Sequence, residues 1–257
     1  MTEKTWLTSR DPRRLLGAIS GMITPGLAFQ LGWGGDFRRQ TPGVLHGTVS
    51  DRKARLFAVA CCYTYQHLIT DQRCRKAVEV SERFADGLAT KRQLVQARTK
   101  LGAKMRGQIR EQIRRTAIAD GRIEQDAEES AANWALGWDL ARDCAIADAW
   151  NSAAHCYFDA EIGGGPGAAV KPHLCELLRD IVGNPYRGVK LDPCWLTANV
   201  MDLANTIYNE RAFDRLPILA DALMDAGCVD EQILKHCRSD GPHVRGCWVV
   251  DLVLGKE

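Results

Sequence analysis

The residue types best suited to hold a metal ion gather near the end of the chain. Cys228, Cys237, His243 and Cys247 are spaced C-x8-C-x5-H-x3-C. Three thiolates and one imidazole suit tetrahedral Zn²⁺, and these intervals match those of CCCH-type zinc fingers with the last two ligand types exchanged. The chain lacks paired C-x2-C knuckles, so a set of buried core thiols is the alternative that we favour over a zinc site.

A thiol enzyme is a second interpretation of the same region, Cys228 to Asp251. On one helix, His243, Cys247 and Asp251 would share a face at i, i+4 and i+8, and an imidazole beside a thiol can generate a thiolate. Their separation along the helix axis argues against a compact triad, so we predict no catalytic residue. Other pairs are weaker candidates, because adjacent side chains on a helix point apart. These pairs are Cys61-Cys62, His155-Cys156 and His236-Cys237.

The formal net charge is only +2, but the charged residues are distributed unevenly. Residues 50–119 hold 16 basic and 6 acidic side chains, whereas residues 120–165 hold 2 basic and 10 acidic side chains. A basic helix over 91–115 could contact the phosphates of a nucleic acid. We favour pairing within the chain, because the turn signal Asp120-Gly121 would fold the basic helix back against the acidic one. Nucleic-acid binding is therefore the less favoured alternative.

Composition places the chain among ordinary globular proteins. It has 257 residues, of which 46% are hydrophobic and 26% charged, and this excludes disordered and fibrous classes. The first residues lack the basic and apolar regions of a secretory signal, and no stretch has the roughly 18 apolar residues that a membrane span needs. Ten cysteines in such a chain indicate reduced core thiols. We expect a cytoplasmic protein without a membrane segment.

Helical periodicity and helix caps recur along the chain and predict an all-α fold of antiparallel helical hairpins or a bundle. A cap residue precedes each of several stretches with apolar residues at helical spacing. These caps are Ser50, Asp71, Thr90, Thr197, Asp214 and Asp230. We expect one long helix from Thr90 through Ala117, another from Ile123 to Tyr157, and a buried helix over Val244–Leu254.

Glycine and proline mark the expected boundaries. Gly163 to Gly167 is a linker that divides an N-terminal helical region at 1–162 from a smaller C-terminal helical module at 168–257. Within the first region, residues 21–49 are rich in glycine and proline and predict a long loop. Trp33 in this loop, with Arg38 and Arg39, could form a contact surface or could pack against the helices.

Several segments carry a resemblance to a known family. They are Ser50-Asp-Arg-Lys-Ala-Arg-Leu-Phe-Ala, Cys61-Cys62, Phe213-Asp-Arg-Leu-Pro-Ile-Leu-Ala-Asp-Ala-Leu, Asp225-Ala-Gly-Cys, His236-Cys-Arg and His243-Val-Arg-Gly-Cys-Trp-Val-Val-Asp-Leu. With these segments, the chain resembles an uncharacterised planctomycete paralogous family over most of its length, except about residues 20–49. The resemblance implies no known activity, cofactor or catalytic residue.

The residues favour no defined activity. We expect a noncatalytic protein that interacts with a protein partner or acts as a scaffold, because helical hairpins offer binding grooves and no catalytic constellation stands out. The alternatives are a zinc-stabilised module or thiol-dependent enzyme built on Cys228 to Asp251, and nucleic-acid binding through the basic helix at 91–115. Neither the partner nor the oligomeric state can be inferred from the sequence.

Overall fold

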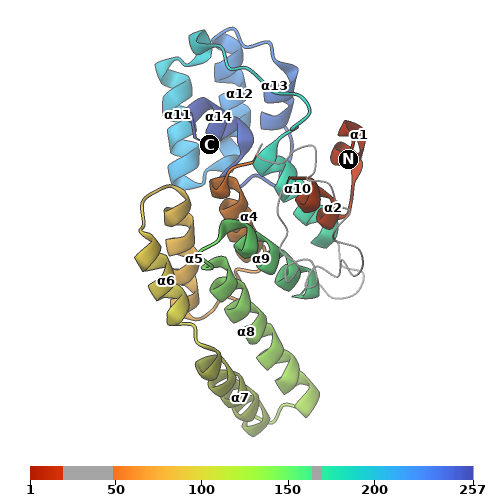
Figure 1. Cartoon of the computed structure of the whole chain (residues 1–257), viewed down its shortest axis with the longest axis vertical. Helices are drawn as coiled ribbons and strands as arrows, with labels where there is room; N and C mark the ends of the chain where they lie inside the picture. The colour runs from red at the N-terminus through yellow and green to blue at the C-terminus, as the bar shows by residue number, and fades with distance from the viewer. Residues whose placement is uncertain (20–48, 164–169, 257) are drawn as a thin grey trace. The chain divides into compact units, whose positions relative to one another are not determined.

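A computed structural model describes residues 1–19, 49–163 and 170–256 (Figure 1). Every regular element in these ranges is helical, which confirms the all-α prediction. The α-helices are α1 (Glu3–Thr8), α2 (Pro12–Ile19), α4 (Asp51–Thr64), α5 (Gln72–Ala85), α6 (Lys91–Thr99), α7 (Ala103–Ala119), α8 (Glu124–Cys144), α9 (Ala149–Gly163), α10 (Val170–Val182), α11 (Ala198–Glu210), α12 (Leu216–Asp225), α13 (Glu231–Cys237) and α14 (Trp248–Leu254). None of these helices is long and apolar enough to cross a membrane.

Two expected irregular segments fall largely outside the described residues. The loop predicted at 21–49, with Trp33, Arg38 and Arg39, is described only at residue 49. The linker predicted from Gly163 to Gly167 is described only at Gly163.

The described residues form two compact units. Unit 1 comprises residues 1–19, 49–53 and 172–256, and unit 2 comprises residues 54–163 with 170–171. The module predicted at 168–257 therefore also takes up α1 and α2, which the sequence prediction assigns to the N-terminal region. One contact that joins α1 to this module is made by Trp6, which is fully buried and donates its indole N–H to the carbonyl of Gly183 at 2.9 Å.

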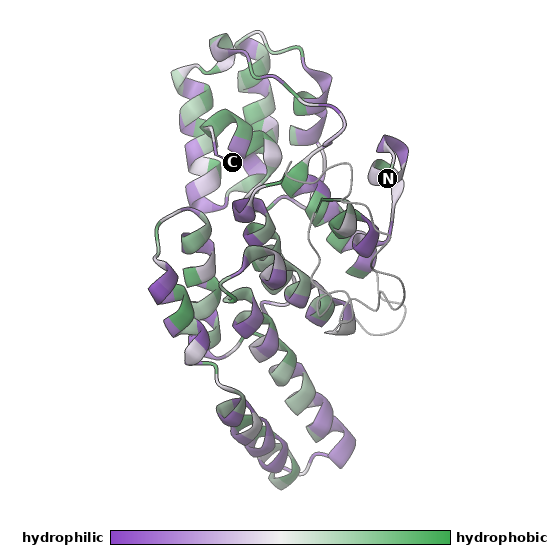
Figure 2. Cartoon of the chain, viewed as in Figure 1, coloured by the Kyte–Doolittle hydropathy of each residue, from purple (hydrophilic) through white to green (hydrophobic). Residues whose placement is uncertain are grey.

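Unit 1 has a hydrophobic core formed largely by α11 to α14. Figure 2 shows the alternation of apolar and polar residues along these helices that allows one face of each to be buried. Thr197 and Asp230 cap α11 and α13 as expected, since their side chains accept backbone N–H bonds. Asp214 instead lies in a short 3-10 helix, Phe213–Arg215, that precedes α12.

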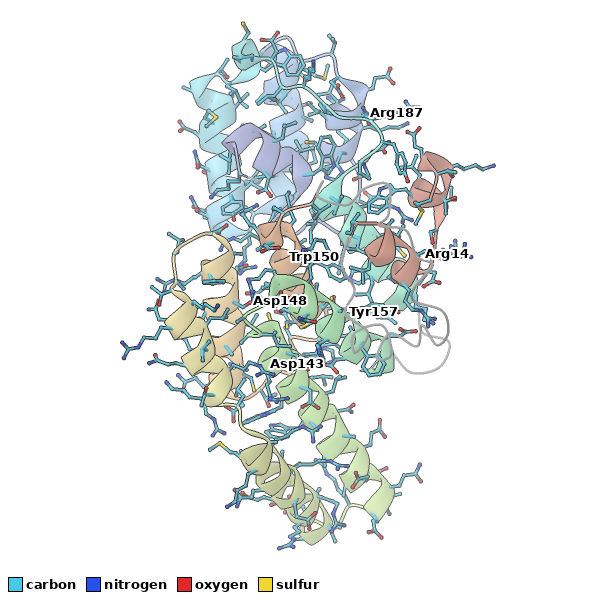
Figure 3. All side chains as sticks on the ribbon, in the orientation of Figure 1. Arg14, Asp143, Asp148, Trp150, Tyr157 and Arg187 are labelled. Atoms are coloured by element: carbon cyan, nitrogen blue, oxygen red, sulfur yellow. The ribbon has the colours of Figure 1, made fainter. Side chains whose placement is uncertain are left out.

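Unit 2 contains α5 to α9 and most of α4. The two long helices that we predicted here are each broken in two. The first breaks between α6 and α7, where the fully buried Leu101 turns its carbonyl toward the indole N–H of Trp138 at 3.3 Å. The second breaks between α8 and α9, where Asp148 accepts the backbone N–H of Asn151 at 2.7 Å and so starts a new helix (Figure 3). The burial of Leu101 at the first break and the cap formed by Asp148 at the second end the helices, although the spacing of apolar residues continues across both breaks.

The predicted hairpin between the basic and acidic helices is present. Gly121 adopts the left-handed φ of +85° at the turn between α7 and α8. Three arginines of α7 form ion pairs with acidic residues of α8. These pairs are Arg106–Asp139, Arg110–Glu128 and Arg114–Glu124. Part of the basic stripe is therefore paired with α8, as the charge pattern predicts.

Candidate metal centre

Four side chains of unit 1 bring together the donor types that transition metals prefer. They are Asp180, His236, His243 and Cys247, and one donor atom from each lies within 4.8 Å of all the others. The set offers one carboxylate oxygen, two imidazole nitrogens and one sulfur. This mixture suits zinc, which accepts oxygen, nitrogen and sulfur ligands in a tetrahedral arrangement.

Three helices position these donors. Asp180 lies in the last turn of α10, among apolar residues that face the core. His236 lies in the last turn of α13, and Cys247 immediately precedes α14. His243 belongs to the connection between α13 and α14, where Gly241 adopts a φ of +88°. A Cβ at Gly241 would lie 2.9 Å from the backbone nitrogen of His243, so glycine is needed to bring the histidine into place.

The donor atoms converge on one region. Nδ1 of His243 lies 2.7 Å from Oδ1 of Asp180. Nε2 of His236 lies 3.2 Å from the same oxygen and 3.2 Å from Sγ of Cys247. Metal bonds of about 2.0–2.3 Å place the corners of a tetrahedron roughly 3.3–3.7 Å apart. The three observed separations, 2.7–3.2 Å, are shorter than this range because the donors are hydrogen-bonded to one another, so the side chains must move apart to admit an ion.

Backbone groups hold the donors in this orientation. The second oxygen of Asp180 accepts the N–H of Val244 at 2.9 Å. Nε2 of His243 lies 3.1 Å from the carbonyl of Ser239, which can only accept, so this nitrogen carries a proton. In a neutral imidazole, Nδ1 then bears a lone pair directed at the Asp180 carboxylate. A proton or a metal ion must therefore lie between Nδ1 of His243 and the Asp180 carboxylate. In metal-bound histidines the other ring nitrogen commonly donates to a backbone carbonyl, as Nε2 of His243 does to Ser239.

Charge and burial act together on the metal-free site. Burial by itself would lower the pKa of His243, but the hydrogen bond and negative charge of Asp180 outweigh burial and raise it. Burial would raise the pKa of Asp180, and the two histidines reverse this and lower it. Burial and the charge of Asp180 raise the pKa of the Cys247 thiol well above its ordinary range. Without a metal ion, Cys247 is therefore a neutral thiol, whereas coordination would deprotonate it.

The arrangement differs from a catalytic thiol triad. In such a triad the thiol and the carboxylate contact opposite nitrogens of one imidazole. Here Cys247 and Asp180 both contact Nε2 of His236, so the ring does not relay a proton between them. The shared helical face predicted for His243, Cys247 and Asp251 is also wrong, because α14 begins only at Trp248. Asp251 instead accepts a hydrogen bond from Arg52 at 2.7 Å.

The structure brings together two of the four metal ligands predicted from the sequence. His243 and Cys247 belong to the cluster, whereas Cys228 and Cys237 are buried in the hydrophobic core of unit 1 outside it. Sequence reasoning missed Asp180 and set His236 aside. The available signal was the placement of an aspartate among Leu177, Leu178 and Ile181, on a helix face that should otherwise be apolar.

The cluster reaches a cavity through one of its members. His236 lines a cavity of about 1300 Å³ in unit 1, together with Lys53, Lys235 and Trp248. The side chain of His236 is 17% exposed, while that of Asp180 is 2% exposed. His236 is therefore the member of the cluster that the cavity reaches, whereas Asp180 is shielded from water.

The resemblance to a planctomycete family stays a prediction. In comparisons with protein-family models, with curated proteins and with solved structures, nothing matches the chain, so the side chains of the site themselves carry the functional inference.

Proposed function

We propose that unit 1 is a zinc-binding helical domain in which Asp180, His236, His243 and Cys247 hold the ion. The observation that carries the proposal is the convergence of four donors of three chemical types within 4.8 Å. The shared contact of Nε2 of His236 with both a carboxylate and a thiol supports it. A hydrogen-bonded relay would use both ring nitrogens, whereas a metal needs the lone pairs to meet at one point.

Charge balance supports a divalent ion. Zn²⁺ with one carboxylate, one thiolate and two neutral imidazoles is electrically neutral. Neutrality matters because Asp180 and Cys247 are almost wholly buried, and an uncompensated charge in such a place is costly. The backbone N–H groups of Val249 and Val250 oppose the effect of burial on the pKa of the Cys247 thiol, because they favour its negatively charged form.

Four protein ligands leave no open position on a tetrahedral ion, so the role that we propose is structural. The ion would join α10 to the connection between α13 and α14. Trp248 lies beside His236 at this junction, with ring centroids 5.2 Å apart. Binding energy of a structural zinc would then contribute directly to the stability of the folded unit.

Metal analysis of untagged protein, purified without chelators, tests the proposal. We expect about one zinc per chain by mass spectrometry, and loss of that zinc in Asp180→Ala and Cys247→Ser. Cys237→Ser is the matched control, because Cys237 is equally buried in the same unit and lies outside the cluster. Zinc that is lost in Cys237→Ser or Cys228→Ser but retained in Asp180→Ala would instead support the ligand set predicted from sequence. Zinc-free protein that also fails to bind added Zn²⁺ would overturn both.

Cobalt substitution keeps the test informative if a variant folds poorly. Co²⁺ bound at this site should give a thiolate-to-cobalt band in the near ultraviolet, from one sulfur only. Cys247→Ser should abolish this band together with the visible bands of tetrahedral cobalt, because the variant no longer holds the ion. A band with the intensity of three thiolates would contradict the ligand set proposed here.

We also propose that the protein works in a reducing compartment such as the cytoplasm. All ten cysteines are within the described residues and are free thiols, and nine of them are buried. Alkylation of protein denatured directly from its host, followed by mass measurement, should show ten modified cysteines. A mass that corresponds to fewer modified cysteines and a disulfide would contradict this.

A further inference from the structure

A second group of metal-binding side chains lies in the core of unit 2. The sulfur atoms of Cys62, Cys144 and Cys156 all lie within 4.8 Å of one another, and all three residues are fully buried. They come from α4, from the last residue of α8 and from α9. The group is separate from the proposed zinc site, which belongs entirely to unit 1.

Hydrogen bonds fix the backbone at the centre of this group. The carbonyl of Cys144 accepts the hydroxyls of Ser81 at 2.7 Å and Ser152 at 2.9 Å, and the guanidinium of Arg55 at 3.4 Å. These donors hold the end of α8 where the other two cysteines approach it. The position of Cys144 Sγ is therefore set by a polar network, and no rearrangement of the helices is needed to gather the thiols.

The other two thiols share one acceptor. Cys62 and Cys156 each direct the sulfur toward the carbonyl of Leu140, at 3.4 Å and 3.5 Å. Leu140 lies one helical turn before Cys144 on α8, so all three sulfurs occupy the same small volume. Thiols are weak donors, and little hydrogen-bond energy is lost when a metal replaces their protons.

The spacing fits a three-coordinate thiolate site. A metal–sulfur bond of about 2.3 Å places the sulfurs of a trigonal site about 4.0 Å apart. Soft d¹⁰ ions such as Cu⁺, Zn²⁺ and Cd²⁺ favour thiolate ligands. The positive charge of Arg55, whose guanidinium reaches the Cys144 carbonyl, partly offsets the excess negative charge of three thiolates around such an ion.

We propose that Cys62, Cys144 and Cys156 form a buried trithiolate site for one soft d¹⁰ metal ion. Binding exchanges three S–H bonds for three metal–sulfur bonds and releases three protons to solvent. No oxidation or reduction takes place. The site would hold its ion inside unit 2, independently of zinc binding in unit 1.

¹¹³Cd nuclear magnetic resonance on the full chain tests the site, with Cd²⁺ as the probe. We expect two resonances, one at the strongly deshielded position of a trithiolate and one at the position of a site with a single sulfur. Cys62→Ser should remove the first resonance only, and Cys247→Ser the second only. Cys61→Ser is the matched control, since Cys61 neighbours Cys62 on α4 and is equally buried but lies outside the group.

Competition with Cu⁺ tests the softness of the site. Because thiolates bind Cu⁺ more tightly than Cd²⁺, one equivalent of Cu⁺ should displace the trithiolate resonance and leave the other unchanged. Loss of the single-sulfur resonance before the trithiolate resonance would contradict the site.

Refolding the protein in the presence of Cd²⁺ is the control for entry of Cd²⁺ into the folded core that is too slow to be detected. Absence of the trithiolate resonance both before and after refolding would overturn the proposal, as would its equal loss in Cys61→Ser. If Cys62→Ser does not fold, Cys156→Ser gives the same readout from another helix. Failure of this test leaves zinc binding at Asp180 and Cys247 unaffected, because the two resonances are separate.

Discussion

The indole N–H of Trp6 donates to the carbonyl of Gly183 across 177 residues of sequence, at 2.9 Å. Gly183 directly follows α10 and has a φ of +73°. The bond therefore joins the first helix of the chain to the end of the helix that carries Asp180. Both residues belong to unit 1, and the contact makes α1 part of the fold that supports the proposed zinc site.

Trp6→Ala should destabilise unit 1 by about 3–5 kcal/mol, because it empties a fully buried site and leaves the Gly183 carbonyl without its donor. Trp6→Phe should cost less, since it keeps most of the apolar volume. Urea unfolding followed by circular dichroism measures both. Leu7→Ala is the control, because Leu7 is 49% exposed and its truncation should change stability by no more than about 0.5 kcal/mol. Equal effects at the two positions would contradict the packing described.

Glycine to alanine should have opposite effects at two helical positions of unit 2. Gly107 in α7 has nothing within 4 Å of an added Cβ, so alanine there should stabilise by up to about 1 kcal/mol. Gly137 in α8 lies against the backbone of Leu68, and an added Cβ would come within 2.2 Å of that carbonyl oxygen. Gly137→Ala should therefore lower the melting temperature and Gly107→Ala should raise it. A stabilising Gly137→Ala would show that the two segments are not in contact.

The ion pair between Arg106 and Asp139 should contribute measurably to the α7–α8 hairpin. Both side chains are about 30% exposed, and two nitrogens of the arginine contact two oxygens of the aspartate. A double-mutant cycle with Arg106→Met and Asp139→Asn should give a coupling of about 1 kcal/mol that falls with added salt. The pair Arg115–Glu111, whose arginine is 75% exposed, should give a smaller coupling. A coupling of zero at Arg106 would contradict the role of charge pairing in the hairpin.

Asp159 should make the stability of unit 2 depend on pH. Burial, together with the charges of Asp143 and Asp139, raises the pKa of Asp159 from 3.8 to about 8. Between these two values the folded state keeps the proton while the unfolded chain loses it. The free energy of unfolding should therefore fall as pH rises from about 4 to about 8 and then level off.

Asp159→Asn provides the comparison for this pH dependence. Asparagine keeps the size of the side chain and has no charge. The free energy of unfolding of the variant should therefore fall less between about pH 4 and about pH 8 than that of the parent chain, and the variant should be the more stable of the two near pH 8. Urea titrations at several pH values measure the difference. A parent chain and variant with the same pH profile would show that Asp159 is ionised in the folded state.

The sequence allowed the helices and many of their ends to be predicted, because the deciding interactions are local. Thr90 and Gln93 form a reciprocal capping box at the start of α6, and Asp71 accepts the N–H of Arg73 at the start of α5. Helix breaks were harder to predict. The turn of Leu101 into the core depends on Trp138, which is distant in sequence.

The metal centre could be predicted only in part for the same reason. His243 and Cys247 lie close together in sequence and have ligand side chains, so their spacing attracts notice. Asp180 reaches them only through the docking of α10, and spacing alone gives no sign of that docking. His236 looked unpromising beside Cys237 because adjacent helical residues diverge, and the structure shows them diverging, one toward the cluster and one into the core.

Asp180 and His243 are separated by 63 residues and meet only when unit 1 is folded. In the unfolded chain, bringing them together costs on the order of 4 kcal/mol of loop-closure entropy. His236, His243 and Cys247 alone would hold zinc more weakly than the complete set. If zinc binds as proposed, its occupancy is coupled to the folding of unit 1, and a zinc-competition titration would report the fraction of unit 1 that is folded.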